Sequence, residues 1–277
     1  MKNLFLFLFL LVVFTSKAQD NRVSGLNSRQ FTKYWKVESE SPDYKVTFQG
    51  DTAEIVSPKG LTLWRKEKMS GKVTIEYDAC VVVESDGDRL SDLNCFWMAS
   101  DPQYPDNLWK REKWRSGIFL NCYSLQLYYL GYGGNHNSTT RFRRYDGDES
   151  GITNPKARPA ILKEYTDAGH LLKPNHWYHI KITNENNRVS YYIDGERLVD
   201  FRDAEPLREG WFGFRTTLSR TRITNFSYEC SSQEAAAVPL QWIGETPRQD
   251  KAVSFGVPFD KGEVFSGKQV TAICREW

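Results

Sequence analysis

A chain of 277 residues is long enough for one large domain or for one domain and a fragment. Its net charge of +2 gives no global field that would favour nucleic acid, and no motif of a nucleic-acid-binding fold occurs, so we expect no nucleic-acid partner. Aromatic residues make up 14% of the chain, which suits a β-sheet core and also a sugar-binding groove, because aromatic rings cover the C–H faces of sugars.

Residues 1–18 have the pattern of a secretory signal peptide. Lys2 precedes an apolar run over residues 4–14, and Ser16 and Ala18 fit a small-x-small cleavage site. The apolar run is too short to span a membrane, and no cysteine stands at the cut to take a lipid. We therefore expect cleavage after Ala18, export to the periplasm or the extracellular space, and no membrane attachment once the signal is removed.

The cysteines form no recognisable metal or redox motif. Their number is odd, their spacing is irregular and no C-x-x-C pair occurs, which argues against a zinc cluster or a thioredoxin-like site. One or two disulfides remain open, but a core of this size does not depend on them, so we expect buried free thiols. The cysteines are Cys80, Cys95, Cys122, Cys230 and Cys274.

The body of the chain has the alternating pattern of β-strands. In residues 72–83 apolar and polar side chains alternate, which predicts a strand with one buried face. Residues 117–131 predict two short strands or one long bent strand. Residues 176–201 give the clearest pattern, in which a strand, an "NENN" turn, a return strand and a tight "DGE" turn lead into a further strand.

Two more strands follow, at "GWFGFRTT" and "TRITNFSYE". Outside the leader no long segment shows the helical period of apolar residues. Alternating strands separated by turns at short intervals predict a β-sandwich or jelly roll, and we expect a monomer.

The run "NHWYHIKITNENNRVSYYIDGERLVDF" with "GWFGFRTTLSRTRITNFSYE" resembles the closing strands of the concanavalin A-like (laminin-G/glucanase) jelly roll. The upstream "GLTLWRKEKMSGKVTIEYDACVV" and "SDLNCFWMASDP" fit its earlier strands, so the resemblance covers about residues 31–229. The pairing of "SDLNCFW" with "YYLGYGGNHNSTTRFRRYDG" is similar to a Bacteroidetes family of that superfamily, DUF6250. The resemblance implies an all-β, concanavalin A-like β-sandwich over residues 25–230, in a superfamily that often holds a structural calcium ion.

Composition changes after Glu229. Small and polar residues followed by a proline predict a linker over residues 231–238. The next run, "VPLQWIGETPRQDKAVSFGVPFDKGEV", resembles the opening of exo-rhamnogalacturonan-lyase-like proteins, whose first β domain is longer. We expect residues 239–277 to be a truncated β segment of that kind, and lyase chemistry that belongs to the remainder of those proteins is carried over to no residue here.

The segment "YYLGYGGNHNSTTRFRRYDG" concentrates aromatic, amide, histidine and arginine side chains over residues 128–147. Elimination at a uronate needs a group that neutralises the carboxylate, a base that removes the adjacent proton and an acid that protonates the leaving oxygen. Arg141, His136 and Tyr132 are the predicted catalytic residues for these roles, and arginine suits the first because its planar fork binds a carboxylate in two places. The alternative is a glycine-rich loop whose arginines pair with surface carboxylates.

Other residues are predicted to contact the glycan. If residues 140–145 form a strand, Arg141 and Arg143 share one face and Phe142 and Arg144 the other, which favours the first pair for a groove. In "SDLNCFWMASDP" a strand would place Asp92 and Asn94 on the same face as Phe96 and Met98, where the two polar side chains could face a groove. The alternative is an ordinary strand start. The substrate-binding candidates are Arg143, Asn135, Asn94, Asp92, Tyr129 and Trp97.

Carboxylates give a weaker signal. The E-x-D-x-x-E motif common in jelly-roll glucanases is absent, and Glu76 and Asp78, which share a strand face, are the candidate pair for a glycosidase. The acidic runs at residues 84–92 and 146–150 supply oxygens that suit a structural Ca²⁺, but neither has EF-hand spacing. No catalytic metal and no definite cofactor are indicated.

Taken together, these patterns predict a secreted, polysaccharide-active protein that recognises an acidic, uronate-containing glycan and cleaves it by lyase chemistry. Two alternatives remain open. One is a non-catalytic carbohydrate-binding module of a larger rhamnogalacturonan-lyase-like protein, and the other is a glycoside hydrolase with a carboxylate pair.

Overall fold

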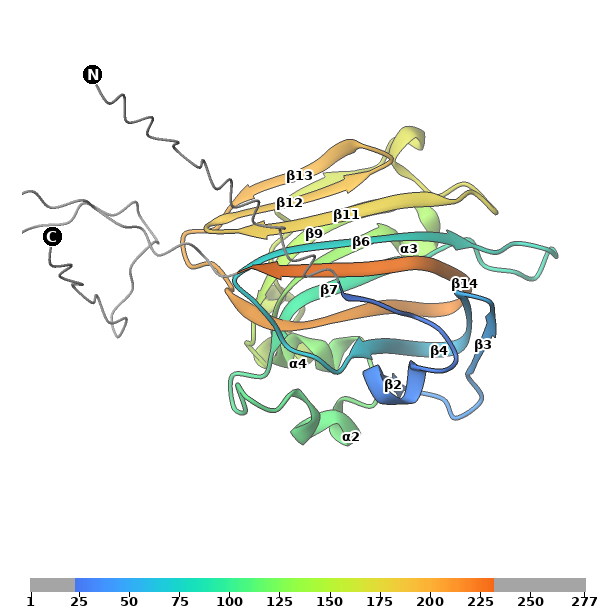
Figure 1. Ribbon diagram of the computed structural model, residues 1–277. Coiled ribbons are helices and arrows are strands. Elements are labelled where there is room, and N and C mark those ends of the chain that lie inside the picture. Colours follow the sequence, from blue (N-terminus) through green and yellow to red (C-terminus); the bar gives the residue numbers. More distant parts are fainter. Residues whose placement is uncertain (1–22, 232–277) are drawn as a thin grey trace, which may run out of the picture.

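A computed structural model describes residues 23–231 of the chain (Figure 1). The predicted signal peptide, the linker beyond Ser231 and the predicted C-terminal β segment lie outside the described residues. The strands are β1 (Val23–Ser24), β2 (Trp35–Ser39), β3 (Lys45–Gln49), β4 (Thr52–Arg65), β5 (Met69–Ser70), β6 (Lys72–Val81), β7 (Leu93–Ser100), β8 (Gln126–Gly133), β9 (Thr139–Asp146), β10 (Lys163–Tyr165), β11 (Tyr178–Glu185), β12 (Arg188–Ile193), β13 (Glu196–Arg202) and β14 (Glu209–Ser231).

Helices in the described residues are single turns between strands. None of them is long and apolar enough to span a membrane. They are α1 (Phe31–Tyr34), η1 (Leu108–Arg111), α2 (Glu112–Arg115), η2 (Leu120–Ser124), α3 (Gly134–Asn137), α4 (Ser150–Thr153), η3 (Pro155–Ala157) and η4 (Ala168–His170).

The strands form two antiparallel layers. The layer called here the front sheet has the order β2–β4–β14–β7–β8–β9–β10. The other layer, the back sheet, has the order β3–β4–β14–β6–β11–β12–β13. The two layers pack face to face, which confirms the predicted all-β jelly roll.

Strands β4 and β14 belong to both sheets. Residues 211–215 of β14 pair with β7, and residues 221–231 pair with β6. Between these stretches the register with β4 shifts at Leu218, which has a φ of 51° and an exposed side chain. This bulge bends the strand, and Figure 1 shows β14 folding back through the second layer. The sequence predicted two strands here, whereas the structure has one bent strand.

The main core lies between the two sheets. Side chains of alternate residues on every long strand enter it, including Val73, Ile75 and Tyr77 of β6, as the pattern of residues 72–83 predicts. The tight turn predicted at "DGE" is also present, with Asp194 and Gly195 at positive φ between β12 and β13.

A second core lies on the outer face of the front sheet. There Trp64, Phe96, Leu127, Tyr145 and Trp211 are buried beneath residues 101–125, called here the cover segment. We call this covered part of the outer face the closed half. The prediction of strand throughout residues 117–131 is therefore wrong in its first part, because the apolar side chains before residue 126 pack onto the sheet from a 3₁₀ turn, η2.

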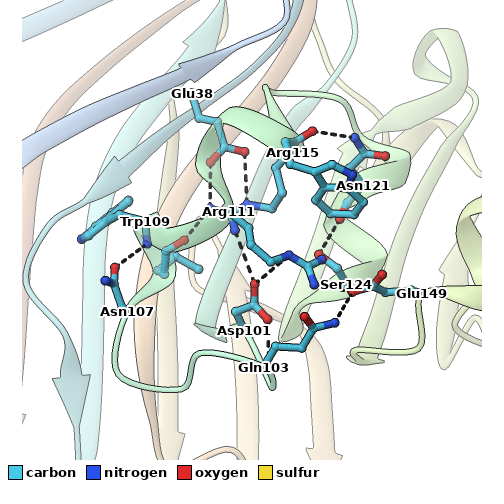
Figure 2. A network of polar contacts seen from close by, with 12 residues as sticks. Glu38, Asp101, Gln103, Asn107, Trp109, Arg111, Arg115, Asn121, Ser124 and Glu149 are labelled. Atoms are coloured by element: carbon cyan, nitrogen blue, oxygen red, sulfur yellow. Dashed lines mark hydrogen bonds and ion pairs between the residues drawn. The ribbon is translucent and has the colours of Figure 1, made fainter.

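A polar network anchors the cover segment, as Figure 2 shows. Arg115, which is fully buried, donates from Nη2 to Glu38 Oε2 at 2.9 Å and to the Leu108 carbonyl oxygen at 2.7 Å. Arg111 lies between two carboxylates: its Nε is 3.4 Å from Asp101 Oδ2, and its Nη1 is 2.5 Å from Glu149 Oε1. Burial raises the pKa of Glu38 above its usual value, although the adjacent Arg115 acts in the opposite direction.

The described cysteines are free thiols. Cys80, Cys95 and Cys122 are buried, as predicted, and Cys230 is half-buried. Burial raises the pKa of Cys122 to about 11, so this thiol is unreactive at neutral pH. Cys274 lies outside the described residues.

Candidate functional site

One cross-strand row of the outer face is polar. The registers align Thr62 of β4 with Arg215 of β14, Asn94 of β7, Gly131 of β8, Arg141 of β9 and Glu164 of β10. On β7 and β8 this row lies two residues along the strand from Phe96 and Tyr129, at the margin of the closed half. We call the surface around Asp92, Asn94, Gly131, Arg141 and Arg215 the open half.

The structure brings Asp92 and Asn94 together in the open half. Asn94 Nδ2 donates to Asp92 Oδ1 at 3.2 Å, and Arg89 pairs with Asp92 Oδ2 at 2.6 Å. Asn94 is buried, and its Oδ1 has no hydrogen-bond partner. Met98 does not share this face as predicted, because a bulge with a φ of 51° at this residue directs it into the main core.

Tyr129 joins the two halves. Its ring is part of the second core, and its hydroxyl lies over Gly131, because a Cβ atom built on that glycine would be 2.3 Å from Tyr129 Oη. Burial, with the negative charge of Asp92 as a smaller cause, raises the pKa of Tyr129. The hydroxyl is thus protonated at neutral pH, and glycine is needed beneath it.

Arg141 and Arg143 share the outer face of β9, as predicted, and Phe142 enters the main core. Arg141 Nε donates to Glu164 Oε1 at 2.6 Å, and one third of its side chain remains exposed. Arg143 is half-buried and donates to the Pro159 carbonyl oxygen.

Arg215 is the main residue of the open half that the sequence analysis missed. It is 3% exposed, and its Nη1 donates to the Gly117 carbonyl oxygen at 2.6 Å and to Thr62 Oγ1 at 3.3 Å, both neutral acceptors. Its guanidinium lies 5.6 Å from the ring of Phe119 in the cover segment. The available signal was an arginine alternating with Phe212 and Phe214 inside an apolar strand.

Two predicted residues lie on the opposite face of the same sheet. Trp97 is fully buried in the main core against Tyr128 and Phe142, so its ring cannot stack on a ligand. Tyr132 also enters the main core, and its hydroxyl donates to the Leu171 carbonyl oxygen at 3.3 Å. The prediction that Tyr132 acts beside Arg141 is therefore not supported, because strand alternation places the two side chains on different faces.

His136 and Asn135 lie in α3, beyond the end of β8, and both are exposed. Both have positive φ, and Asn135 Nδ2 donates to Ser138 Oγ at 3.1 Å within the same turn. The described structure thus places the predicted base in a turn, the predicted acid inside the sandwich and Arg141 on the outer face.

The acidic candidates are engaged with protein groups. Asp78 of the proposed glycosidase pair lies 2.7 Å from His179 Nδ1, on the outer face of the back sheet, away from the open half. In the first acidic run Asp88 accepts the Glu84 and Ser85 N–H groups, and in the second Asp148 accepts two bonds from Ser150. Within residues 23–231 no group of three or more His, Cys, Asp or Glu side chains could hold a metal ion, so the predicted calcium site gains no support.

Comparison with solved structures gives the same fold. A galectin-like protein of unknown function from Bacillus subtilis matches with a TM-score of 0.57 at 15% identity, over 73% of this chain and 91% of that one. The Emp47p carbohydrate recognition domain matches with a TM-score of 0.50 at 14% identity, over 77% and 96%. The VIP36 exoplasmic/lumenal domain, in its Ca²⁺/Man3GlcNAc-bound form, matches with a TM-score of 0.51 at 9% identity, over 79% and 91%.

No curated protein matches this chain. Two family models do. Residues 236–276 match the PcRGLX-like N-terminal RIFT barrel domain, in agreement with the predicted resemblance of the C-terminal segment. Residues 55–226, most of the chain, match the domain of unknown function DUF6250, and the chain therefore belongs to the DUF6250 family.

Proposed function

We propose that the open half binds an acidic, uronate-containing glycan and that this chain is a non-catalytic carbohydrate-binding module of a larger rhamnogalacturonan-lyase-like protein. The observation that carries the proposal is an excess of positive charge on this surface. Arg89 pairs with Asp92 and Arg141 with Glu164, whereas Arg143 and Arg215 take part in no ion pair among the described residues.

The position of Arg215 supports an anionic ligand. A buried cation is costly unless it is paired or hydrogen-bonded, and Arg215 donates to two neutral oxygens and interacts with the charge of Glu38 without a direct ion pair. Here the guanidinium lies under the floor of the open half and raises the positive potential above it, which favours a carboxylate. Arg141 is the more exposed arginine and supplies the planar fork that a uronate carboxylate binds.

Neutral polar groups of the open half suit sugar hydroxyls. Asn94 Oδ1 is buried at the floor of this surface and lacks a partner, and the protonated hydroxyl of Tyr129 lies over Gly131. An acceptor and a donor close to a guanidinium are the groups needed to orient a sugar ring by its hydroxyls. Two proteins of the same fold, a carbohydrate recognition domain and a domain bound to Man3GlcNAc, support sugar as the ligand class.

Binding is favoured over cleavage because the predicted lyase residues do not converge. An acid and a base must reach the same sugar from hydrogen-bonding distance. Tyr132 is 2% exposed on the inner face, and His136 lies in the turn beyond the strand. Tyr132 therefore does not meet this condition beside Arg141.

The ends of the sequence support the wider role. Residues 236–276 match a PcRGLX-like domain, which is the basis for placing this module beside lyase-type domains. The leader-like residues 1–18 favour a periplasmic or extracellular location, where polysaccharides are met. Cell fractionation tests the location: export predicts a mature protein that begins after Ala18 outside the cytoplasm.

Affinity electrophoresis in polygalacturonate gels tests the glycan proposal. We expect the protein to be retarded by polygalacturonate and not by a neutral galactan, and to lose retardation as ionic strength rises. Arg141→Gln should weaken the apparent affinity about tenfold or more, equivalent to about 1.4 kcal/mol.

Arg188→Gln is the matched control, because Arg188 Nε also donates to a carboxylate at 2.6 Å on an exposed strand, in the back sheet. Equal losses for the two variants, or equal retardation by the neutral galactan, would contradict the proposal. Release of unsaturated uronates, detected by their ultraviolet absorbance, would show lyase activity and overturn the non-catalytic assignment.

A further inference from the structure

A cavity lies at one end of the sandwich, on the other side of β8 from the open half. The end of β8, the η4 turn, the start of β11 and the β12–β13 turn surround a cavity of about 140 Å³, called here the end hollow. Its principal side chains are Tyr132, His170, His176, Tyr178, Asp194 and Glu196. A pocket for a drug-sized ligand begins at about 300 Å³, so this volume suits one small molecule and excludes the interior of a polymer.

Aromatic rings form part of the wall. The Tyr132 and Tyr178 rings meet edge to face at 5.1 Å, and His176 meets Tyr178 in the same way at 4.5 Å. The hydroxyl of Tyr178 accepts the Lys173 N–H at 2.7 Å. These contacts fix the rings, so the wall is formed before any ligand arrives.

Two histidine–carboxylate pairs come from different chain segments. His170 Nε2 lies 3.3 Å from Glu196 Oε1, and His176 Nε2 lies 3.6 Å from Asp194 Oδ2. The other ring nitrogen of His170, Nδ1, lies 2.8 Å from the Asp167 carboxylate. Asp194 Oδ1 accepts the His179 N–H at 2.7 Å, which holds the turn in place. Glu196 is more exposed than the other three side chains and has one long contact, so its carboxylate remains available to a ligand.

We propose that the end hollow binds a single neutral sugar ring. Carboxylates accept charge-assisted hydrogen bonds from sugar hydroxyls, and the imidazole of His176 donates to them or accepts from them. The exposed ring of His176, which lies edge to face on Tyr178, offers a flat surface to the C–H face of such a ring. The lining carries two carboxylates, Asp194 and Glu196, and one ammonium group, Lys173, so its charge balance is negative and disfavours an acidic sugar. The two surfaces therefore select different ligands.

Histidine NMR signals test this directly, because the chain has four histidines and two of them line the hollow. D-galactose, D-glucose and L-rhamnose are titrated separately, with D-galacturonate as the acidic probe. We expect at least one neutral sugar to shift the ring signals of His170 and His176 saturably. The dissociation constant should lie in the millimolar range, which corresponds to a binding free energy of about 4 kcal/mol. The signals of His136, which lies outside the lining, should not move, and D-galacturonate should bind at least about tenfold more weakly.

Glu196→Gln should weaken the neutral sugar about tenfold, because it removes a charged acceptor. The control Glu185→Gln makes the same change at an exposed residue at the end of β11, paired with Lys72, and should leave the affinity unchanged. The proposal is overturned if none of the three neutral sugars gives a saturable shift, if all four histidines shift together, or if Glu196→Gln has no effect. Polygalacturonate binding by the open half is unaffected by any of these outcomes, so the two proposals fail separately.

Discussion

The closed and open halves of the front sheet are built by the same strands and differ in what covers them. On β7 Phe96 faces the cover segment, and two residues earlier Asn94 lies in the open half. On β8 the ring of Tyr129 lies in the closed half, and two residues later Gly131 lies in the open half. The exposed aromatic platform expected from composition is thus largely absent from this face, because these rings form a second core and the face left open carries arginines, amides and glycine.

The largest expected loss of stability comes from removing the ion pair beneath the cover segment. Arg115→Ala removes the partner of the buried Glu38 and should lower the free energy of unfolding by about 3–5 kcal/mol, because an uncompensated charge stays inside the protein. Urea denaturation measures the loss. Arg188→Ala is the control at a surface ion pair and should leave the free energy of unfolding nearly unchanged. Equal losses in the two variants would show that the Glu38 pair does not anchor the cover segment.

A smaller effect is expected at the margin of the open half. Gly131→Ala places a methyl group 2.3 Å from Tyr129 Oη and 2.8 Å from its Cζ, so the tyrosine must move. Overpacking of this kind costs about 1–3 kcal/mol. We expect weaker polygalacturonate retardation together with this loss of stability. Gly87→Ala, where the nearest atom is 4.0 Å away, should change neither quantity, and an unaltered Gly131→Ala protein would disprove the close approach.

Most of the fold could be predicted from the sequence, since it follows from local rules. Alternation in residues 72–83 identifies the buried face of β6, and an Asp-Gly pair specifies the turn between β12 and β13. The bend of β14 and the cover segment could not be predicted in this way. A leucine at positive φ has no sequence signature, and apolar side chains in a 3₁₀ turn resemble those of a strand until the packing partner is known.

The candidate site was predictable within a strand and not between strands. Alternation alone places Arg141 and Arg143 together on β9. Whether Tyr132 joins them depends on the register of β8 against β9, which the turn at α3 sets through positive φ at Asn135, His136 and Asn137. Arg215 was overlooked because an arginine in an apolar strand is conspicuous only when its burial is known.

The pH dependence of stability tests the burial of Glu38 in the closed half. Burial in the closed half raises the pKa of Glu38, so between its ordinary value and the raised one the folded protein holds a proton that the unfolded chain has released. The free energy of unfolding should therefore fall as pH rises through this interval, by at most about 1.4 kcal/mol per pH unit. Urea denaturation from about pH 4 upward measures the slope for Glu38. Glu38→Gln should flatten the slope, and an unchanged slope would assign it to other groups.

The smallest expected change in stability is at Tyr129, whose ring belongs to the closed half and whose hydroxyl lies in the open half. Tyr129→Phe keeps the ring in the second core and removes only the hydroxyl over Gly131. Because the ring packing is retained, the free energy of unfolding should change by about 1 kcal/mol or less. Polygalacturonate affinity should still fall several-fold, since the ligand loses a donor over Gly131, in the row that also holds Asn94 and Arg141. Electrophoresis and urea denaturation of the same preparation measure both effects. Tyr44→Phe, at an exposed tyrosine, is the control for loss of a phenolic hydroxyl. A fall in stability without a fall in affinity would mean that Tyr129 serves only the closed half, and the glycan surface would then have to be redrawn around Arg141 and Arg143.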